Sequence, residues 1–326
     1  MSAPLSVACV RSGLVESQHR VRLVVADARG EPVLACGPVD EPVFPRSALK
    51  PLQAAALVRH GLRLDAPLLA LAAASHSGEP FHLDGVRRIL AGAGLSEDAL
   101  RTPAQLPLGE AAARAWLAAG RGPEPVAMNC SGKHAAMLAA CVANGWPTEG
   151  FRDPAHPVQQ AVRDTVTRCC GEPPAAVGVD GCGAPVFALT LRGLARGFAT
   201  LARAAPGSPE GLVAAAVRAY PEWASGTGRD LARLVRAVPG LLAKEGAEGV
   251  YAAALPDGRA VALKVEDGAD RARLPVMVEA LVHCGVPRAD LAGLVPVPVL
   301  GGGQPVGELR VAPLDAPAPR YDDQVS

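Results

Sequence analysis

Arg46-Ser47-Ala48-Leu49-Lys50-Pro51-Leu52-Gln53 opens a helix that the sequence continues through residues 54–58. Proline fits only the first turn of a helix, because it lacks a backbone N–H and its ring clashes with the preceding turn. Pro51 therefore places Ser47 at the helix start and Lys50 one turn further along the same face. At this spacing a neutral lysine can take the proton of the serine hydroxyl, which is otherwise a poor nucleophile.

The Ser47–Lys50 pair is a short motif, and a second sequence element supports a catalytic role for it. Because the unperturbed pKa of lysine is about 10.4, burial or a nearby cation must lower it before the amine can act as a base. Lys244-Glu245-Gly246, placed ahead of an apolar strand, resembles the Lys-Thr-Gly element that accompanies Ser-x-x-Lys in penicillin-recognising hydrolases. Their Ser-Asp-Asn element is absent from the sequence in that form, which argues against an ordinary β-lactamase.

In its place the chain carries Asn129-Cys130-Ser131-Gly132-Lys133-His134, which leads into an alanine-rich helix. The unpaired N–H groups at a helix start favour anions, including a thiolate. Cys130, Lys133, His134 and Cys182 are candidate metal ligands, since thiolates suit zinc, but no Cys-x-x-Cys motif is present. Cys130 and Cys182 both lie in glycine-flanked polar turns, so these patterns leave open whether the two thiols are structural or functional.

The overall composition indicates a soluble protein that acts on a small molecule. The 326 residues carry 32 basic and 32 acidic side chains, so the charge excess typical of nucleic-acid or anionic-membrane binding is missing. No apolar run approaches the roughly 20 residues that span a bilayer, and the start of the chain has no signal-peptide pattern. We therefore expect a cytoplasmic protein with no nucleic-acid or membrane partner, in which most of the eight scattered cysteines are free thiols.

Residue patterns predict a mixture of antiparallel strands and helices. We expect hairpins over residues 21–37 and 250–265, a short buried strand at 176–179 and an edge strand within 295–311. Helices are expected over 82–93, 110–119 and 231–238. A further helix is expected to begin with Asp153 as N-cap and Pro154 as first residue and to end at Gly171. Another is expected to include the helically spaced Phe187, Leu191, Leu194 and Phe198. No internal repeat or linker interrupts the chain, so we predict one catalytic α/β (α+β) domain over 1–315 and a disordered tail over 316–326.

Five segments together resemble the rhizobial-type L-asparaginase family, also called asparaginase II. They are Pro45-Arg46-Ser47-Ala48-Leu49-Lys50-Pro51, Ser75-His76-Ser77-Gly78-Glu79, Asn129-Cys130-Ser131-Gly132-Lys133-His134, Asp180-Gly181-Cys182 and Lys244-Glu245-Gly246-Ala247-Glu248-Gly249. The resemblance extends over about residues 12 to 312 and includes Gly226-Thr227-Gly228-Arg229.

This resemblance implies an antiparallel sheet flanked by helices, similar to the fold of serine β-lactamases and glutaminases, and hydrolysis of L-asparagine to L-aspartate and ammonia. It also implies a zinc ion, and it favours a homodimer. The positions that match the family's metal ligands are Cys130, Lys133 and Cys182. Those that match its two serine–lysine tandems are Ser47 with Lys50 and Ser75 with Lys244. The residues expected to bind substrate are Arg46, His76, Glu79, Asn129, His134, Asp180 and Gly246.

The expected mechanism is an acyl transfer. Ser47, deprotonated by Lys50, attacks the side-chain amide carbonyl, and helix-terminal N–H groups hold the oxyanion. Ser75 and Lys244 assist proton delivery to ammonia and activation of the hydrolytic water. The zinc ion is expected to position the amino acid rather than to carry out the chemistry.

Three other functions fit the sequence. One is a thiol amidohydrolase that uses Cys130 and His134, and another is a glutaminase or other serine amidase of related fold. The third is a non-catalytic zinc or amino-acid sensor. Two departures from the family pattern concern substrate preference: Glu245 replaces a small hydroxyl residue, and Gly183-Ala184 leaves more room than bulkier variants.

Overall fold

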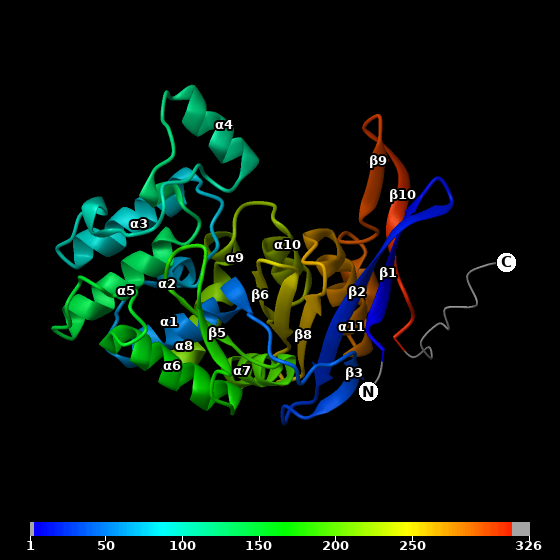
Figure 1. The fold of residues 1–326 in the computed structure, drawn as a ribbon, viewed down its shortest axis with the longest axis horizontal. Helices are drawn as coiled ribbons and strands as arrows, with labels where there is room; N and C mark the ends of the chain where they lie inside the picture. Colours follow the sequence, from blue (N-terminus) through cyan, green and yellow to red (C-terminus); the bar gives the residue numbers. More distant parts are fainter. Residues whose placement is uncertain (1–2, 315–326) are drawn as a thin grey trace.

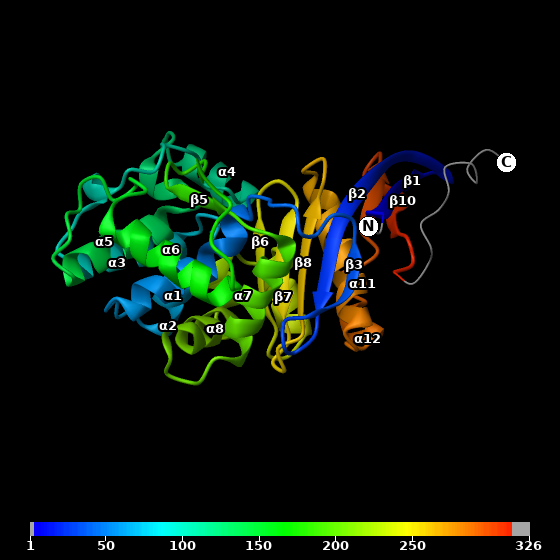
Figure 2. The ribbon, with the colours of Figure 1, turned by 60° about the horizontal axis from the view of Figure 1, so that its bottom comes forward.

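The computed structural model describes residues 3–314, which form an antiparallel sheet beside a group of packed helices (Figure 1). The turned view shows the same two parts side by side, with strand β6 nearest to the helices (Figure 2). This arrangement confirms the predicted mixed fold of an antiparallel sheet flanked by helices with a helical part. The tail predicted over 316–326 lies outside the described residues.

The sheet has eight strands and runs in the order β6-β7-β8-β2-β1-β10-β9, with β3 added beside β2. Its strands are β1 Leu5–Arg11, β2 Leu14–Ala26, β3 Pro32–Cys36, β6 Leu242–Gly246, β7 Val250–Ala254, β8 Ala260–Val265, β9 Pro298–Gly301 and β10 Gln304–Val311. The long strand β2 pairs with β1 over its first part and with β3 over its last part, while β8 pairs with it on the other side. Strands from both ends of the chain thus meet in one sheet.

The helical part is built around α1. Every residue of α1 (Lys50–Arg59) except Arg59 is buried, because α5, α6 and α8 pack around it. The other helices are α2 Ala66–Ala72, α3 Pro80–Gly92, α4 Glu110–Ala118, α5 Ser131–Ala143, α6 Pro157–Cys170, α7 Leu191–Arg203, α8 Pro209–Ala219, α9 Pro221–Ala224, α10 Asp230–Ala237, α11 Arg273–His283 and α12 Arg288–Leu291. Helices α7 and α11 pack against β7 and β8, whose residues are almost all buried. A helix buried on all sides, as α1 is, lies in the core.

Several predicted elements are confirmed. The hairpin over 21–37 is formed by β2 and β3, and the hairpin over 250–265 by β7 and β8. The helices predicted at 82–93, 110–119 and 231–238 correspond to α3, α4 and α10. The predicted edge strand is β9, and β10 lies inside the sheet between β9 and β1. All eight cysteines are free, as expected, and within residues 3–314 no helix is long and apolar enough to cross a membrane.

Two predicted helix starts are wrong. The N-cap of α6 is His156, whose ring accepts a hydrogen bond from the Val158 N–H, whereas Asp153 caps a separate turn by accepting from the Ala155 N–H. Phe187 lies on strand β5 (Pro185–Ala188), and α7 begins only after the Thr190 side chain has capped the Gly193 N–H. In both places a side-chain cap a few residues later decides where the helix begins.

Two predicted strands also differ from expectation. Strand β4 (Ala176–Val179) pairs only with β5 and is largely exposed, with 80% of Val179 accessible, so it is not a buried strand. Lys244 does not precede a strand but lies within one, β6, which is fully buried. Burial of β6 matters for function because it removes the lysine amine from water.

Candidate active site

Residues 74–77 bring Ser75 to the centre of the site. The N–H groups of residues 75–77 are held from both sides: Ser75 N donates to Ala224 O, His76 N to Asn129 O and Ser77 N to Ser225 O. The segment follows α2 without regular secondary structure and lies between the turn before α5 and the end of α9. Ser75 is 7% exposed, so its hydroxyl lies in a nearly dry environment.

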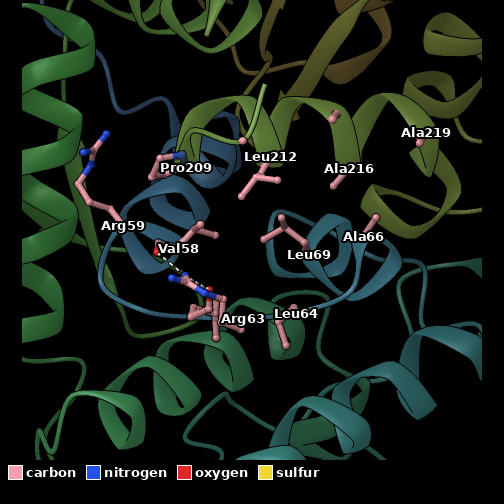
Figure 3. A pocket seen from close by; sticks show the side chains of 13 residues that line it. Val58, Arg59, Arg63, Leu64, Ala66, Leu69, Pro209, Leu212, Ala216 and Ala219 are labelled. Carbon is pink, nitrogen blue, oxygen red and sulfur yellow. Dashed lines mark hydrogen bonds between the residues drawn. The ribbon is translucent and has the colours of Figure 1, made fainter. Parts of the chain in front are cut away.

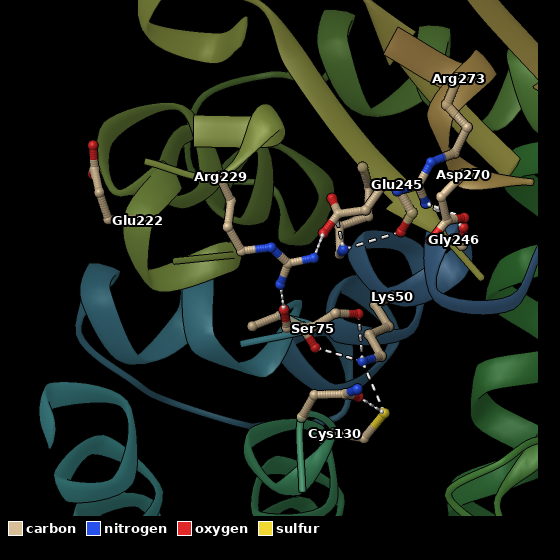
Figure 4. A network of polar contacts seen from close by, with 12 residues as sticks. Lys50, Ser75, Cys130, Glu222, Arg229, Glu245, Gly246, Asp270 and Arg273 are labelled. Carbon is tan, nitrogen blue, oxygen red and sulfur yellow. Dashed lines mark hydrogen bonds and ion pairs between the residues drawn. The ribbon is translucent and has the colours of Figure 1, made fainter. Parts of the chain in front are cut away.

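Lys50, in the first turn of α1, contacts Ser75 directly (Figure 4). Its Nζ lies 3.0 Å from Ser75 Oγ, 2.5 Å from Ala74 O and 3.0 Å from Cys130 Sγ. Within residues 3–314 its amine makes no hydrogen bond to Ser47, although its backbone N–H donates to Ser47 O in the 3-10 turn Arg46–Leu49 ahead of α1. The structure therefore places Lys50 against the other serine of the two predicted tandems.

Lys244 on β6 is fully buried and binds its neighbour Glu245. Its Nζ donates to Glu245 O at 3.0 Å and lies 3.1 Å from Glu245 Oε2, so the predicted contact with Ser75 is replaced by an ion pair. Burial lowers the pKa of Lys244 to about 8; the nearby Lys50 and Arg229 also lower it, whereas Glu245 raises it. An amine with this pKa is largely neutral in mildly alkaline solution, as a general base requires.

Cys130, Lys133 and Cys182 meet in one buried cluster. Cys130 is the N-cap of α5, Lys133 lies in its first turn, and Lys133 Nζ is 3.1 Å from Cys182 Sγ. A hydrogen bond from Cys130 lowers the pKa of Cys182, against the effect of burial, and the Lys133 ammonium lowers it further. The same hydrogen bond, together with burial, raises the pKa of Cys130. Burial lowers the pKa of Lys133, but the two nearby sulfurs raise it, and the net shift is upward.

These three residues match the donor chemistry of a soft metal ion. Within residues 3–314 no group of three or more His, Cys, Asp or Glu side chains is arranged to hold a metal, and here the third donor is a lysine. Two sulfur atoms and an amine nitrogen nevertheless converge, and beside them neither ring nitrogen of buried His134 has a hydrogen-bond partner. Sulfur and nitrogen donors suit zinc, provided that the amine gives up its proton to the metal.

His134 does not form the predicted dyad with Cys130. Its ring makes no hydrogen bond to that thiol, and burial lowers its pKa. The raised pKa of Cys130 keeps the thiol protonated, whereas a nucleophilic cysteine needs a lowered one. The geometry of the described residues therefore does not favour a thiol amidohydrolase.

Arg46 and Asp180 form an ion pair at the edge of this cluster. Arg46 Nε donates to Asp180 Oδ1 at 2.6 Å, and Asp180 Oδ2 lies 4.0 Å from Cys182 Sγ. Arg46 has a φ of 53°, in the left-handed region that a side chain rarely adopts. A guanidinium and a carboxylate, both partly accessible, are the two charges needed to bind the carboxylate and ammonium of an amino acid.

The other predicted substrate-binding side chains are used to hold the site together. His76 Nε2 lies 2.9 Å from Ser131 Oγ, and the Glu79 carboxylate caps α3 and accepts from Thr227 N at 2.8 Å. Asn129 Oδ1 lies 3.0 Å from Cys130 Sγ. These contacts connect the loops that carry Ser75, Cys130 and Arg229.

Gly246 allows the Arg46–Leu49 turn to approach β6. A Cβ at this position would lie 2.3 Å from Pro45 O and 3.2 Å from Ala48 N, both of them backbone atoms. We expect Gly246→Ala to lower the free energy of unfolding by about 1–3 kcal/mol, as overpacking does, and to reduce activity by displacing the turn that leads into Lys50. Denaturant unfolding measures the effect, and Gly122→Ala, where nothing lies within 4 Å of the new Cβ, is the control. Equal stability of the two variants would contradict this prediction.

Arg229 is a site residue that the sequence analysis did not select. It donates to Ser75 O at 2.6 Å and to Glu245 Oε1 at 3.2 Å, and it is held by the glycine-containing turn before α10. The small number of lysines is a further feature of the sequence that marks the site. The chain has four, Lys50, Lys133, Lys244 and Lys264, and the first three are buried in the site. Buried lysines are rare, so three of four indicates selection for the amine itself.

The candidate residues are separate from the apolar groove at α1, α2 and α8 (Figure 3). That groove has a volume of about 630 Å³ and is lined by side chains such as Val58, Leu69 and Leu212, with Arg59 and Arg63 at its edge. None of the predicted catalytic, substrate-binding or metal-binding residues lines it. The candidate site is therefore defined by converging polar groups.

A serine hydroxyl held against a buried lysine amine is a pairing that can generate a nucleophilic oxygen. A family model described as L-asparaginase II matches residues 7–311, so the chain belongs to the L-asparaginase II family and is an amidohydrolase that acts on a small-molecule amide. The family named from the sequence motifs is thereby confirmed. No protein of curated function matches the chain.

Proposed function

We propose that this amidohydrolase converts L-asparagine to L-aspartate and ammonia in the cytoplasm through a serine acyl-enzyme, and that it acts as a homodimer. Membership of the L-asparaginase II family supports the substrate. The observation that carries the mechanism is the 3.0 Å contact between Lys50 Nζ and Ser75 Oγ in a buried setting. A base must lie within hydrogen-bonding distance of the proton that it removes, and Lys50 meets this condition for Ser75.

The geometry favours Ser75 as the nucleophile. Lys50 takes the Ser75 proton and Oγ attacks the amide carbon. The Lys50 ammonium then gives that proton to the amide nitrogen, so that the tetrahedral intermediate expels ammonia and leaves an aspartyl ester. Water then hydrolyses the ester, with Lys244 accepting its proton. Ser47, with its hydroxyl unpaired among the described residues and Lys50 one turn away, is the alternative nucleophile that the sequence motif suggested.

Substrate binding in this proposal uses the charged rim of the thiol cluster. Arg46 and Asp180 offer a guanidinium and a carboxylate, which match the two charged groups of an amino acid. Zinc, held by Cys130, Lys133 and Cys182, would add a positive centre for the amino acid's α-carboxylate. Residues of the chain carry out the proton transfers.

Trapping the acyl-enzyme distinguishes the two serines. We expect acid-quenched enzyme to carry the aspartyl ester on the peptide that contains Ser75, because Lys50 contacts that hydroxyl. Ser47→Ala is expected to keep the adduct and lose roughly tenfold or less in kcat, because Lys50 contacts the Ser75 hydroxyl and not that of Ser47. Peptide mass mapping checks both points. An ester on Ser47 would reverse the assignment.

A direct assay tests the function itself. Ammonia release from L-asparagine, L-glutamine and a β-lactam, compared by kcat/KM with and without added zinc, separates an asparaginase from a glutaminase and from another serine amidase. We expect the highest value for L-asparagine. Tight binding of an amino acid without ammonia release would instead identify a sensor.

A further inference from the structure

Glu245 connects the two sides of the candidate site (Figure 4). One carboxylate oxygen lies 3.1 Å from Lys244 Nζ, and the other accepts from Arg229 at 3.2 Å. Arg229 in turn donates to the backbone oxygen of Ser75 at 2.6 Å. A continuous set of contacts therefore runs from Lys244 through Glu245 and Arg229 to Ser75.

Glu245 also supplies negative charge to a cluster of cations. Lys244 faces Glu245 on β6, Lys50 on α1 and Arg229 before α10. Glu245 itself faces Lys244, Arg229, Arg273 on α11 and the Tyr251 hydroxyl on β7. Glu222 and Asp270, which are also labelled in Figure 4, are paired elsewhere, Glu222 with Arg236 and Asp270 with Arg273. Buried cations need a counter-ion, because a lone charge in a dry site is strongly disfavoured.

We propose that Glu245 is a positioning residue for the amide hydrolysis: it fixes the Lys244 amine and, through Arg229, the backbone of Ser75. The inference rests on the proposed function, in which Lys244 accepts the proton of the hydrolytic water. It gives a role to a buried carboxylate that the proposed proton transfers leave unused. An uncharged side chain at this position could not bridge a lysine and an arginine in this way.

The direction of the pH effect follows from the charges. Burial lowers the pKa of Lys244 to about 8, and the carboxylate of Glu245 opposes this lowering. Without that charge the pKa of Lys244 falls further, since Lys50 and Arg229 remain. If neutral Lys244 is the base, activity rises with pH through the pKa of Lys244. This rise is the acidic limb of the pH profile of activity. Loss of Glu245 therefore moves the acidic limb to lower pH, whereas loss of Arg229 moves it to higher pH.

The test compares pH profiles of kcat/KM for ammonia release from L-asparagine. We expect Glu245→Gln to shift the acidic limb down by about 1–3 pH units, the usual effect of an opposite charge at this range, together with a lower kcat. Arg229→Gln should shift the limb upward. Glu222→Gln, the same change at a carboxylate outside the contact chain, should leave the limb in place.

A purely structural role for Glu245 would lower activity or thermal stability without moving the limb, and that result overturns the proposal. Glu245→Asp keeps the charge but shortens the side chain, so it should retain the limb of the wild-type enzyme with reduced kcat. Arg229→Gln decides the question if Glu245→Gln fails to fold. A downward or unchanged limb in Arg229→Gln contradicts the charge argument.

Lysine titration followed by NMR separates this inference from the proposed function. The chain has only four lysines, so protein labelled with ¹³C-lysine gives few side-chain signals, and Lys244→Arg assigns the one of interest. We expect the Lys244 signal to titrate near pH 8 in the wild type and lower in Glu245→Gln. A wild-type enzyme that releases no ammonia from either amide rejects the proposed function, and the NMR titration then decides alone whether Glu245 controls Lys244.

Discussion

Lys50→Met is expected to lower kcat/KM for L-asparagine by a factor of about 10²–10⁴, the usual contribution of a general base. Methionine has a similar length and is apolar, so it fits the buried start of α1 while removing the amine. Among the described residues the hydroxyl of Ser75 then has no base within hydrogen-bonding distance, because Lys50 Nζ is the group that contacts it at 3.0 Å. Steady-state ammonia release over a range of substrate concentrations measures the loss.

The control for Lys50→Met is Lys264→Met. Lys264 is the lysine outside the site, on β8, where its Nζ donates to Val265 O. The same chemical change there should leave kcat/KM within about twofold, as expected for surface substitutions. Thermal unfolding of both variants shows whether either change acts through stability. A Lys50→Met variant with near wild-type turnover would remove Lys50 from the mechanism.

Cys182→Ser is expected to abolish stoichiometric zinc binding. Structural and catalytic zinc sites use three or four ligands, so loss of a thiolate from a set of two thiols and one amine leaves too few strong donors. The lowered pKa of Cys182 makes it the thiolate of the pair, which is the form that binds metal. Elemental analysis of the purified protein measures the metal content directly, independently of activity.

Cys36→Ser is the matched control for the metal experiment. Cys36 is a buried free thiol on β3, far in sequence from the cluster, and its replacement should leave the zinc content unchanged. Chelation of the wild-type enzyme then tests the role of the metal. A raised KM with retained kcat supports substrate positioning, whereas complete loss of kcat argues for a direct chemical role. Equal zinc in Cys182→Ser and wild type would exclude Cys182 as a ligand.

The contacts also explain why sequence patterns predicted some elements and missed others. Pro51 correctly marked the first turn of α1, because the missing N–H of proline excludes later positions. The start of α6 was misplaced because Asp153-Pro154 and His156-Pro157 both look like an N-cap with a first helical proline. Local sequence gives no means to choose between two such starts, and the structure uses the second.

The sequence by itself determined the family and the residue types of the site. Five motifs identified L-asparaginase II, and the family match over residues 7–311 confirms it. The motifs also gave Cys130, Lys133 and Cys182 as one set of metal ligands, and the structure brings their two thiols and the amine together. Such motifs can be recognised in a sequence because turns and helix starts depend on residues that are close together along the chain.

Tertiary structure alone decided which side chains meet. Ser-x-x-Lys spacing suggested Ser47 as the partner of Lys50, yet Lys50 contacts Ser75, 25 residues away, because Ala224, Asn129 and Ser225 hold residues 75–77 against the start of α1. Tertiary structure likewise places Arg229 between Glu245 and Ser75, which are far apart in the sequence. Helical spacing fixes which residues share a face, but the direction of a long lysine side chain depends on the charges and hydroxyls that packing brings within its reach.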